Sequence, residues 1–218
     1  MNDEQSALKV AEFLLKIKAV ELSPSAPFTW ASGMKSPIYC DNRKTLSYPE
    51  IRDFLRDRFA AIVTEKYGKP DVIAGVATGG IALGALVAQQ LNLPFIYVRS
   101  EAKKHGLGNQ VEGVLEKGQK VVVIEDLVST GKSSLNAVAA LREAGAEVLG
   151  MVAIFTYNFQ KAADNFLNAQ CELKTLTDYD SLLSQALQSK YIDDIQLNSL
   201  RAWKSDPEKW SESFAVNG

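Results

Sequence analysis

The stretch VVVIEDLVSTGKSS, residues 121–134, joins an apolar, β-branched run to two acids and then to a run of small residues. KVVVIED (120–126) predicts a buried strand, because β-branched residues favour strands and the run contains no breaker. SSLNAVAALREAG (133–145) has helical spacing and ends in a glycine, so it predicts a helix. The stretch therefore predicts a strand, a short loop and a helix in succession.

The same alternation continues on both sides of this stretch. Further strands are predicted at 71–76, 94–98, 146–157 and 171–176, and further helices at 47–68, 79–92, 163–170 and 178–190. Strands that alternate with helices build a mainly parallel sheet with helices on both faces. We therefore expect an α/β fold with a central, mainly parallel sheet flanked by helices, whose sites lie at the carboxyl ends of the strands.

Composition narrows the class of protein. The 218 residues include 24 basic and 26 acidic ones, and this net charge of −2 argues against a general nucleic-acid binder. Cys40 and Cys171 lie far apart and lack metal-ligand spacing, which favours a reducing compartment and argues against zinc. We expect a cytoplasmic protein.

Two stretches could be mistaken for membrane or export signals. Residues 1–20 carry acids where a signal peptide has a basic end, so they predict an amphipathic helix instead. Residues 72–98 carry no charge and are long enough to span a membrane. Their glycines and Pro94 favour a strand, a turn, a helix and a second strand, so no membrane partner is expected.

The letters GKSS invite comparison with a nucleoside-triphosphate P-loop. That motif needs its first glycine five residues before Gly131, where this chain has Asp126. A carboxylate there would repel the phosphate that the backbone N–H groups of a P-loop surround. The sequence therefore disfavours a nucleotide hydrolase.

The stretch divides instead into two binding regions. A small-residue loop opens the helix, and its N–H groups, hydroxyls and positive helix end suit one phosphate group; its members are Ser129, Thr130, Gly131, Lys132, Ser133 and Ser134. Glu125 and Asp126 suit hydroxyl donors or a hydrated Mg²⁺, although a pair of acids can also simply end a strand. Phosphate at one end and vicinal hydroxyls at the other describe a ribose 5-phosphate.

Three motifs support a resemblance to a known family. VVVIEDLVSTGKSS resembles the 5-phosphoribosyl 1-diphosphate (PRPP) motif of the type I phosphoribosyltransferases. FTWASGMKSPIYCDNR (28–43) resembles the N-terminal signature of the orotate phosphoribosyltransferases, and RSEAKKHGLGNQVEG (99–113) resembles their catalytic loop. The resemblance implies a type I phosphoribosyltransferase fold with a small N-terminal hood at 1–45 that contributes to the base site. The core would span 46–200 with a catalytic loop at 99–113, and 201–218 would form a peripheral tail.

The resemblance also implies a reaction. Such an enzyme is a pentosyltransferase of pyrimidine biosynthesis: it transfers the 5-phosphoribosyl group of PRPP to orotate, giving orotidine 5′-monophosphate and diphosphate. Its cofactor would be Mg²⁺, held mainly through PRPP and water rather than by direct protein ligands. It would act as a homodimer in which each catalytic loop reaches the neighbouring active site.

The resemblance assigns roles to individual residues. Catalysis would involve Lys103, His105, Arg99 and Asp126. PRPP contacts would come from Thr78, Gly79, Arg99, Lys103, His105, Glu125, Asp126, Leu127, Val128, Ser129, Thr130, Gly131, Lys132 and Ser133, and Ser129 would also touch orotate. Physically, a glycine-flanked loop of cations can close over a diphosphate and neutralise the leaving group, although it can also be a solvated basic loop.

Some positions depart from the family pattern, and two other functions stay open. Some relatives have lysine where this chain has Ala31 and Ser100, and Tyr39 and Cys40 align with a base-stacking pair although cysteine stacks poorly. A sister transferase for a purine, xanthine or uracil base would keep the PRPP motif unchanged. A non-catalytic PRPP-sensing regulator would bind PRPP without turnover.

Overall fold

The structure is a computed structural model that describes residues 3–30, 33–100 and 110–215. By its internal contacts the chain divides into two compact units. One comprises Leu46–Leu176, and the other combines Met1–Thr45 with Thr177–Gly218.

The larger unit is built on one sheet. In the described part of the chain this sheet has six strands in the order β10-β9-β8-β5-β6-β7. β5 (Val72–Val76), β6 (Phe95–Val98), β8 (Lys120–Val128) and β9 (Glu147–Thr156) pair in parallel, and β7 (Val111–Glu112) is antiparallel to β6. β10 (Leu173–Asp178) completes the sheet at the other edge. The predicted α/β fold with a mainly parallel sheet is confirmed.

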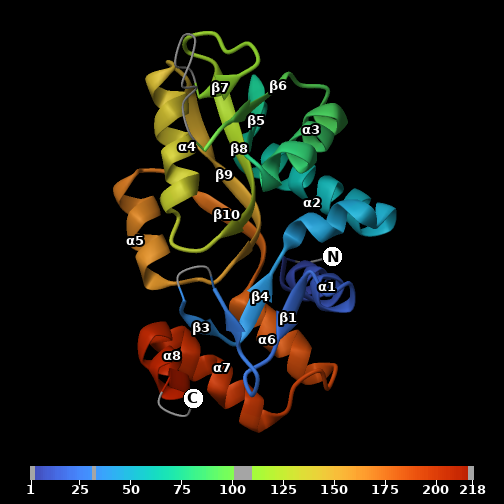
Figure 1. The fold of residues 1–218 in the computed structure, drawn as a ribbon. Helices are drawn as coiled ribbons and strands as arrows, with labels where there is room; N and C mark the ends of the chain where they lie inside the picture. Colours follow the sequence, from blue (N-terminus) through green and yellow to red (C-terminus); the bar gives the residue numbers. More distant parts are fainter. Residues whose placement is uncertain (1–2, 31–32, 101–109, 216–218) are drawn as a thin grey trace. The chain divides into compact units, whose positions relative to one another are not determined.

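Helices cover both faces of this sheet. α2 (Pro49–Tyr67) and α3 (Gly79–Leu91) lie on one face, and α4 (Lys132–Glu143) lies on the other (Figure 1). Val121 and Val123 of β8 pack into a core cluster with Val138 and Leu141 of α4, and α5 (Gln160–Asn168) adds residues to the same cluster. Side chains alternate along a strand, so the residues between these valines face α3.

Most element boundaries lie within a few residues of those predicted from the sequence. α2 begins at Pro49 rather than at residue 47, because a 3₁₀ segment occupies Asn42–Ser47 and Tyr48 takes the cap position. Gly68 ends this helix with a positive φ of 70°, a conformation that glycine adopts readily. Part of the predicted loop at 99–113 is β7, and residues 101–109 lie outside the described range.

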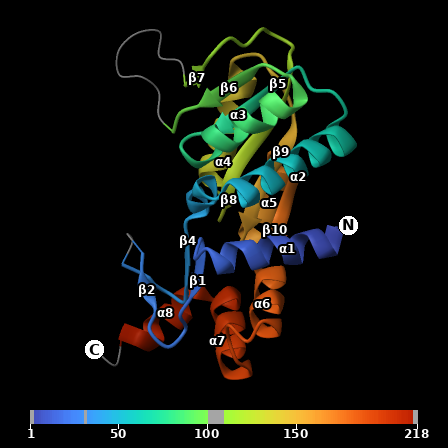
Figure 2. The same ribbon diagram turned by 90° about the vertical axis from the view of Figure 1, so that its right-hand side faces the viewer.

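The smaller unit brings the two ends of the sequence together. It holds α1 (Asp3–Lys16), the antiparallel pair β1 (Val20–Leu22) and β4 (Ile38–Cys40), and the hairpin of β2 (Phe28–Thr29) and β3 (Lys35–Ser36). Its C-terminal part is α6 (Tyr179–Gln188), α7 (Asp194–Ser205) and α8 (Pro207–Ala215). α1 lies beside α6 (Figure 2) and has the amphipathic character that the sequence predicted.

The C-terminal residues differ from the expected peripheral tail. Trp203 is fully buried and Trp210 nearly so, and Ser211 Oγ accepts a hydrogen bond of 2.8 Å from the Lys35 N–H. Residues 177–200, expected in the core, group by contacts with 1–45 instead. The physical reason is that Leu197, Leu200 and Trp203 form one apolar helix face, which must be buried.

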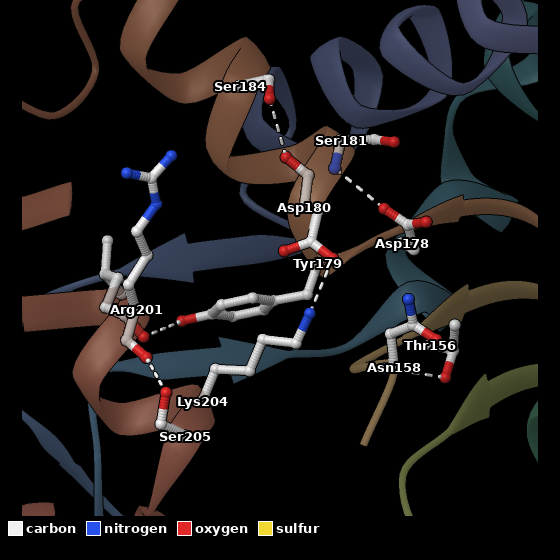
Figure 3. A network of polar contacts seen from close by, with 11 residues as sticks. Thr156, Asn158, Asp178, Tyr179, Asp180, Ser181, Ser184, Arg201, Lys204 and Ser205 are labelled. Atoms are coloured by element: carbon white, nitrogen blue, oxygen red, sulfur yellow. Dashed lines mark hydrogen bonds and ion pairs between the residues drawn. The ribbon is translucent and has the colours of Figure 1, made fainter. Parts of the chain in front are cut away.

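A polar network links α6 and α7 (Figure 3). The buried Tyr179 hydroxyl donates to the Leu200 carbonyl at 3.1 Å, and Lys204 Nζ lies 2.6 Å from Asp180 Oδ2. Burial raises the pKa of Tyr179 far above its ordinary value, and the Asp180 charge adds to the shift. The phenol therefore stays neutral and acts as a hydrogen-bond donor within the unit.

Among the described residues, no helix is both long and apolar enough to cross a bilayer.

Candidate active site

The candidate site residues of the larger unit gather where β5 and β8 end. These strands are parallel neighbours, with Gly75 opposite Ile124, so their carboxyl ends lie at the same edge of the sheet. The turn to α3 follows β5, and the two acids and the small-residue loop follow in β8 and after it. Sequence segments about 50 residues apart thus meet at one place, as parallel sheets arrange them.

The two acids point to opposite faces of the sheet. Glu125 continues the side of Val121 and Val123, toward α4, and Asp126 continues the side of Ile124, toward α3. Their environments differ accordingly: Glu125 is 5% exposed and Asp126 is half-buried.

Glu125 lies in a closed, hydrogen-bonded position. Its Oε1 accepts the Asp126 N–H at 3.0 Å, and its Oε2 accepts the Ser134 hydroxyl at 3.0 Å. Burial, together with the charge and side chain of Asp126, raises the pKa of Glu125 to about 8, while the hydrogen bonds from the Asp126 N–H and the Ser134 hydroxyl act in the opposite direction. The structure therefore holds Glu125 in a buried position that disfavours its charged form.

Asp126 lies against the start of α3. A Cβ added to Gly79 would overlap the Asp126 carboxylate, and one added to Gly80 would overlap the Ile124 carbonyl oxygen. Glycine at both positions lets the turn after β5 approach β8 closely. The Ala77–Thr78 peptide in this turn is cis, and the Thr78 side chain is exposed. Thr78, Gly79 and Asp126, all predicted site residues, thus come together.

The phosphate loop predicted from the sequence forms a tight connection. Residues 129–131 join β8 to α4, and Gly131 caps the helix with a φ of +81°. The Leu135 N–H donates to the Gly131 carbonyl at 2.8 Å, so the three preceding N–H groups, those of residues 132–134, have no acceptor within the helix. Such a helix start attracts an anion.

Helix α5 supports this loop from behind. Asn165 Nδ2 donates to the Thr130 carbonyl at 2.9 Å, and a Cβ on Gly131 would come within 2.7 Å of the Phe166 ring. Within the loop Ser129 and Thr130 are partly exposed, and Lys132 and Ser133 are exposed at the helix start. Leu127 and Val128 are still strand residues, paired with Phe155 and Thr156 of β9. They would reach a ligand through their backbone.

Arg99 lies at the end of β6, where the predicted catalytic loop begins. Its N–H donates to the Gln110 carbonyl at 2.9 Å, and its Nη1 lies 3.5 Å from Glu112 Oε1. The two ends of the 99–113 segment are therefore held together by strand pairing. Lys103, Lys104 and His105 lie outside the described residues.

The smaller unit carries the N-terminal signature. Phe28 and Tyr39 have ring centroids 5.7 Å apart, and Tyr39 is 41% exposed. Cys40 Sγ donates to Asn42 Oδ1 at 3.3 Å, so this thiol has a partner within its own unit. Tyr39 is thus partly open to solvent, and the Cys40 thiol is bonded to the Asn42 side chain.

The described residues contain no group of three acids, histidines or cysteines arranged to hold a metal ion. They do provide Asp126, a half-buried carboxylate at the edge of the sheet beside an anion-attracting helix start. Mg²⁺ suits such a position, because it keeps several waters and binds through one or two carboxylates and ligand phosphates.

Sequence reasoning missed three supporting residues. Ser134 was grouped with the phosphate loop, but its hydroxyl points to Glu125. Asn165 and Phe166 were not singled out, because no local pattern connects α5 to a loop 35 residues earlier. Helical spacing could have placed Ser134 on the buried side of α4, in line with Val138 and Leu141.

Comparison with known proteins places these features in a family. The profile of the family described as "Phosphoribosyl transferase domain" matches residues 47–178. The chain is 58% identical over 200 residues to the orotate phosphoribosyltransferase of Phocaeicola vulgatus, covering 92% of this chain and 94% of that protein. It is 56% identical over 200 residues to the one from Bacteroides thetaiotaomicron, with the same coverage. The crystal structure of orotate phosphoribosyltransferase from Aeropyrum pernix superposes with a TM-score of 0.73 at 28% identity, covering 84% of this chain and 99% of that one.

Proposed function

The chain belongs to the phosphoribosyl transferase domain family and, within it, to the orotate phosphoribosyltransferases; on that basis we propose the following account of its reaction. It transfers the 5-phosphoribosyl group of PRPP to orotate and releases diphosphate, giving orotidine 5′-monophosphate. The C1–O bond to diphosphate breaks and its electron pair leaves with the diphosphate. A bond forms between C1 of the ribose and a ring nitrogen of orotate, and the proton of that nitrogen is released to solvent. This is a pentosyl transfer of pyrimidine biosynthesis.

One observation supports this proposal above the others. A single strand–loop–helix unit presents acceptors for hydroxyls in its strand, and an anion-attracting helix start at Lys132, four residues after the strand ends at Val128. A ribose 5-phosphate carries hydroxyls and a phosphate in the same order. The residues proposed to hold the 5-phosphate are Ser129, Thr130, Gly131, Lys132 and Ser133.

The acids take the sugar side of the proposed site. Asp126 and Glu125 hydrogen-bond to the ribose hydroxyls, and the negative field of the Asp126 carboxylate stabilises the positive charge that develops on the ring, which is oxocarbenium-like in such displacements. Thr78 and Gly79, in the turn after β5, are proposed to bind the diphosphate. Leu127 and Val128 contribute only backbone groups. Ser129 is also proposed to contact orotate, and residues 28–43 to take part in base recognition because they resemble the family's signature.

Mg²⁺ is proposed as the cofactor. When bound it would neutralise the charge on the diphosphate and so make it a better leaving group. Asp126 is the described side chain best suited to reach it through water, and most of its ligands would be PRPP oxygens and water. The protein's own contribution is to fix the sugar and phosphate on either side.

Arg99, Lys103 and His105 are proposed to close over the diphosphate from the neighbouring subunit of a homodimer. Lys103 neutralises the leaving group, His105 supports it, and Arg99 anchors it. A closed loop would also exclude water, which otherwise hydrolyses PRPP. A cytoplasmic location is proposed because Cys40 and Cys171 form no disulfide, which suits a reducing compartment.

Lys103→Ala tests the catalytic role of the loop. We expect kcat to fall by about 10²–10³-fold, the cost of losing one preorganised donor to a developing anion, with a much smaller loss of PRPP binding. Steady-state kinetics and titration calorimetry with PRPP measure the two quantities. Equal losses in rate and affinity would mean that Lys103 only binds.

The base specificity is tested by a direct assay. The absorbance of orotate is followed after adding PRPP and Mg²⁺, with hypoxanthine, xanthine and uracil as alternative acceptors. We expect turnover with orotate and at most background with the other bases. Preference for another base would identify a sister transferase, and PRPP binding without any turnover would identify a sensor.

A further inference from the structure

Ser134 is the polar member of an apolar helix face. The buried residues of α4 are Ser134, Ala137, Val138, Ala140 and Leu141. The four apolar ones pack into the core cluster with the β8 valines. Ser134 is 1% exposed, and its hydroxyl donates to Glu125 Oε2 at 3.0 Å. A serine at this position is therefore explained by Glu125 rather than by packing.

Glu125 is held by one donor from its own strand and one from the helix. Asp126 N–H binds Oε1 and Ser134 binds Oε2, each at 3.0 Å. Each oxygen uses one hydrogen bond here, so Glu125 keeps capacity for a hydroxyl of a ligand, as an acceptor when ionised and also as a donor when protonated. The two bonds fix the plane and the rotamer of the carboxylate without using up its acceptors.

We propose that Ser134 is a positioning residue for the transferase reaction: its hydroxyl fixes the Glu125 carboxylate relative to the phosphate loop. This inference rests on the proposed function. Ser134 belongs to the first turn of α4, whose free N–H groups would bind the 5-phosphate, and Glu125 would accept the ribose hydroxyls. Phosphate and hydroxyls are joined covalently in PRPP at a fixed separation, so their two binding groups must be held at a matching separation. The Ser134–Glu125 bond provides that link.

Ser134→Ala is the first test, in the full-length protein with orotate saturating. We expect kcat/KM for PRPP to fall by about 10- to 100-fold, since misplacing a contact by about 1 Å can cost a factor of about 10². The KM for orotate should stay within about twofold, because the base does not contact Glu125 in the proposed site. Orotate binding should therefore not depend on where the Glu125 carboxylate lies. Thr177→Val is the matched control: it also removes a buried hydroxyl, in β10, and should leave both constants unchanged.

Two variants of matched shape distinguish the effect of losing the Ser134 hydroxyl from the effect of changing the side-chain volume. Ser134→Thr keeps the hydroxyl and Ser134→Val replaces it with a methyl group of similar size, so any clash is common to both. We expect the threonine variant to exceed the valine variant at least about tenfold in kcat/KM for PRPP, which is the lower end of the loss expected for misplacement. Equal activities would overturn the proposal, even if both variants were less stable than the wild type.

A double-mutant cycle tests whether Ser134 acts through Glu125. If it does, Ser134→Ala combined with Glu125→Gln should be no worse than Glu125→Gln alone, because the interaction is already lost. Multiplicative losses would show that Ser134 acts independently and would overturn the inference. The wild type serves as the reference: if it fails to consume PRPP with orotate, the proposed function falls, whereas an active wild type with an equally active Ser134→Ala variant overturns only this inference.

Discussion

Gly131 is under two separate constraints. Its φ of +81° lies in the left-handed region, and a Cβ there would come within 2.7 Å of the Phe166 ring. It also caps α4 at the phosphate loop, so both constraints act on the proposed site. The two constraints can be tested separately, because Gly118 also has a left-handed φ but has no neighbour that an added Cβ would touch.

We expect Gly131→Ala to lower the free energy of unfolding more than Gly118→Ala. Gly118 has a φ of +86° and open space around a Cβ, so its substitution should cost only the left-handed strain, about 1–2 kcal/mol. Gly131→Ala should lose a further 1–3 kcal/mol or so from overpacking against Phe166. Urea denaturation of both variants measures the difference. Equal losses would mean that the Phe166 ring moves aside without cost.

Glu125 and Asp126, near the end of β8, are adjacent in sequence but lie in different environments. Because side chains alternate across the sheet, Glu125 enters the layer under α4 and Asp126 the layer toward α3. Glu125 is thus buried and hydrogen-bonded, while Asp126 stays partly accessible. Of the two adjacent carboxylates, Asp126 is therefore the one better placed to meet a hydrated cation.

At the scale of elements, α8 supports the N-terminal hairpin. Trp210 Nε1 donates to Ser199 Oγ of α7 at 3.1 Å, and the next residue, Ser211, accepts the Lys35 N–H of β3 at 2.8 Å. Trp30, just after β2, meets Trp203 of α7 edge to face, with centroids 6.0 Å apart. The short hairpin thus depends on the C-terminal helices of its own unit, since two-stranded hairpins are marginal alone.

Trp210→Ala tests this dependence. We expect a loss of about 3–5 kcal/mol in the free energy of unfolding, the usual cost of truncating a buried tryptophan. Hydrogen exchange at the Lys35 amide should accelerate, because α8 would no longer hold Ser211 in place. Ile195→Ala on α7 is the control: Ile195 is 81% exposed, and its loss should change stability by about 0.5 kcal/mol at most. Unchanged exchange at Lys35 would show that the hairpin stands without α8.

At the scale of the whole molecule, the proposed dimer makes a quantitative prediction. Lys103→Ala and Asp126→Asn chains, each inactive alone, are mixed under conditions that exchange subunits. If each loop serves the neighbouring site, every hybrid has one intact site, and a two-fold dimer formed from equal amounts should recover about a quarter of the wild-type activity. No recovery would place the loop over the site of its own chain.

Apart from the short edge strand β7, the sequence by itself determined the sheet, its flanking helices and the chemical order of the β8–α4 unit. These follow from local causes: β-branched runs, helical spacing and glycine at turns act over a few residues and need no knowledge of distant partners. The three motifs likewise placed the chain in its family, because each is a contiguous stretch.

Only the tertiary structure decided which groups surround these residues. The Ser134–Glu125 bond, the Asn165 support of Thr130 and the burial of Trp203 all join segments that no local pattern connects. The same holds for residues 177–218, which group with the N-terminal segment because the apolar faces of α6 and α7 need burial that short-range propensity cannot assign. Long-range packing, rather than propensity, selects the partner of each buried group.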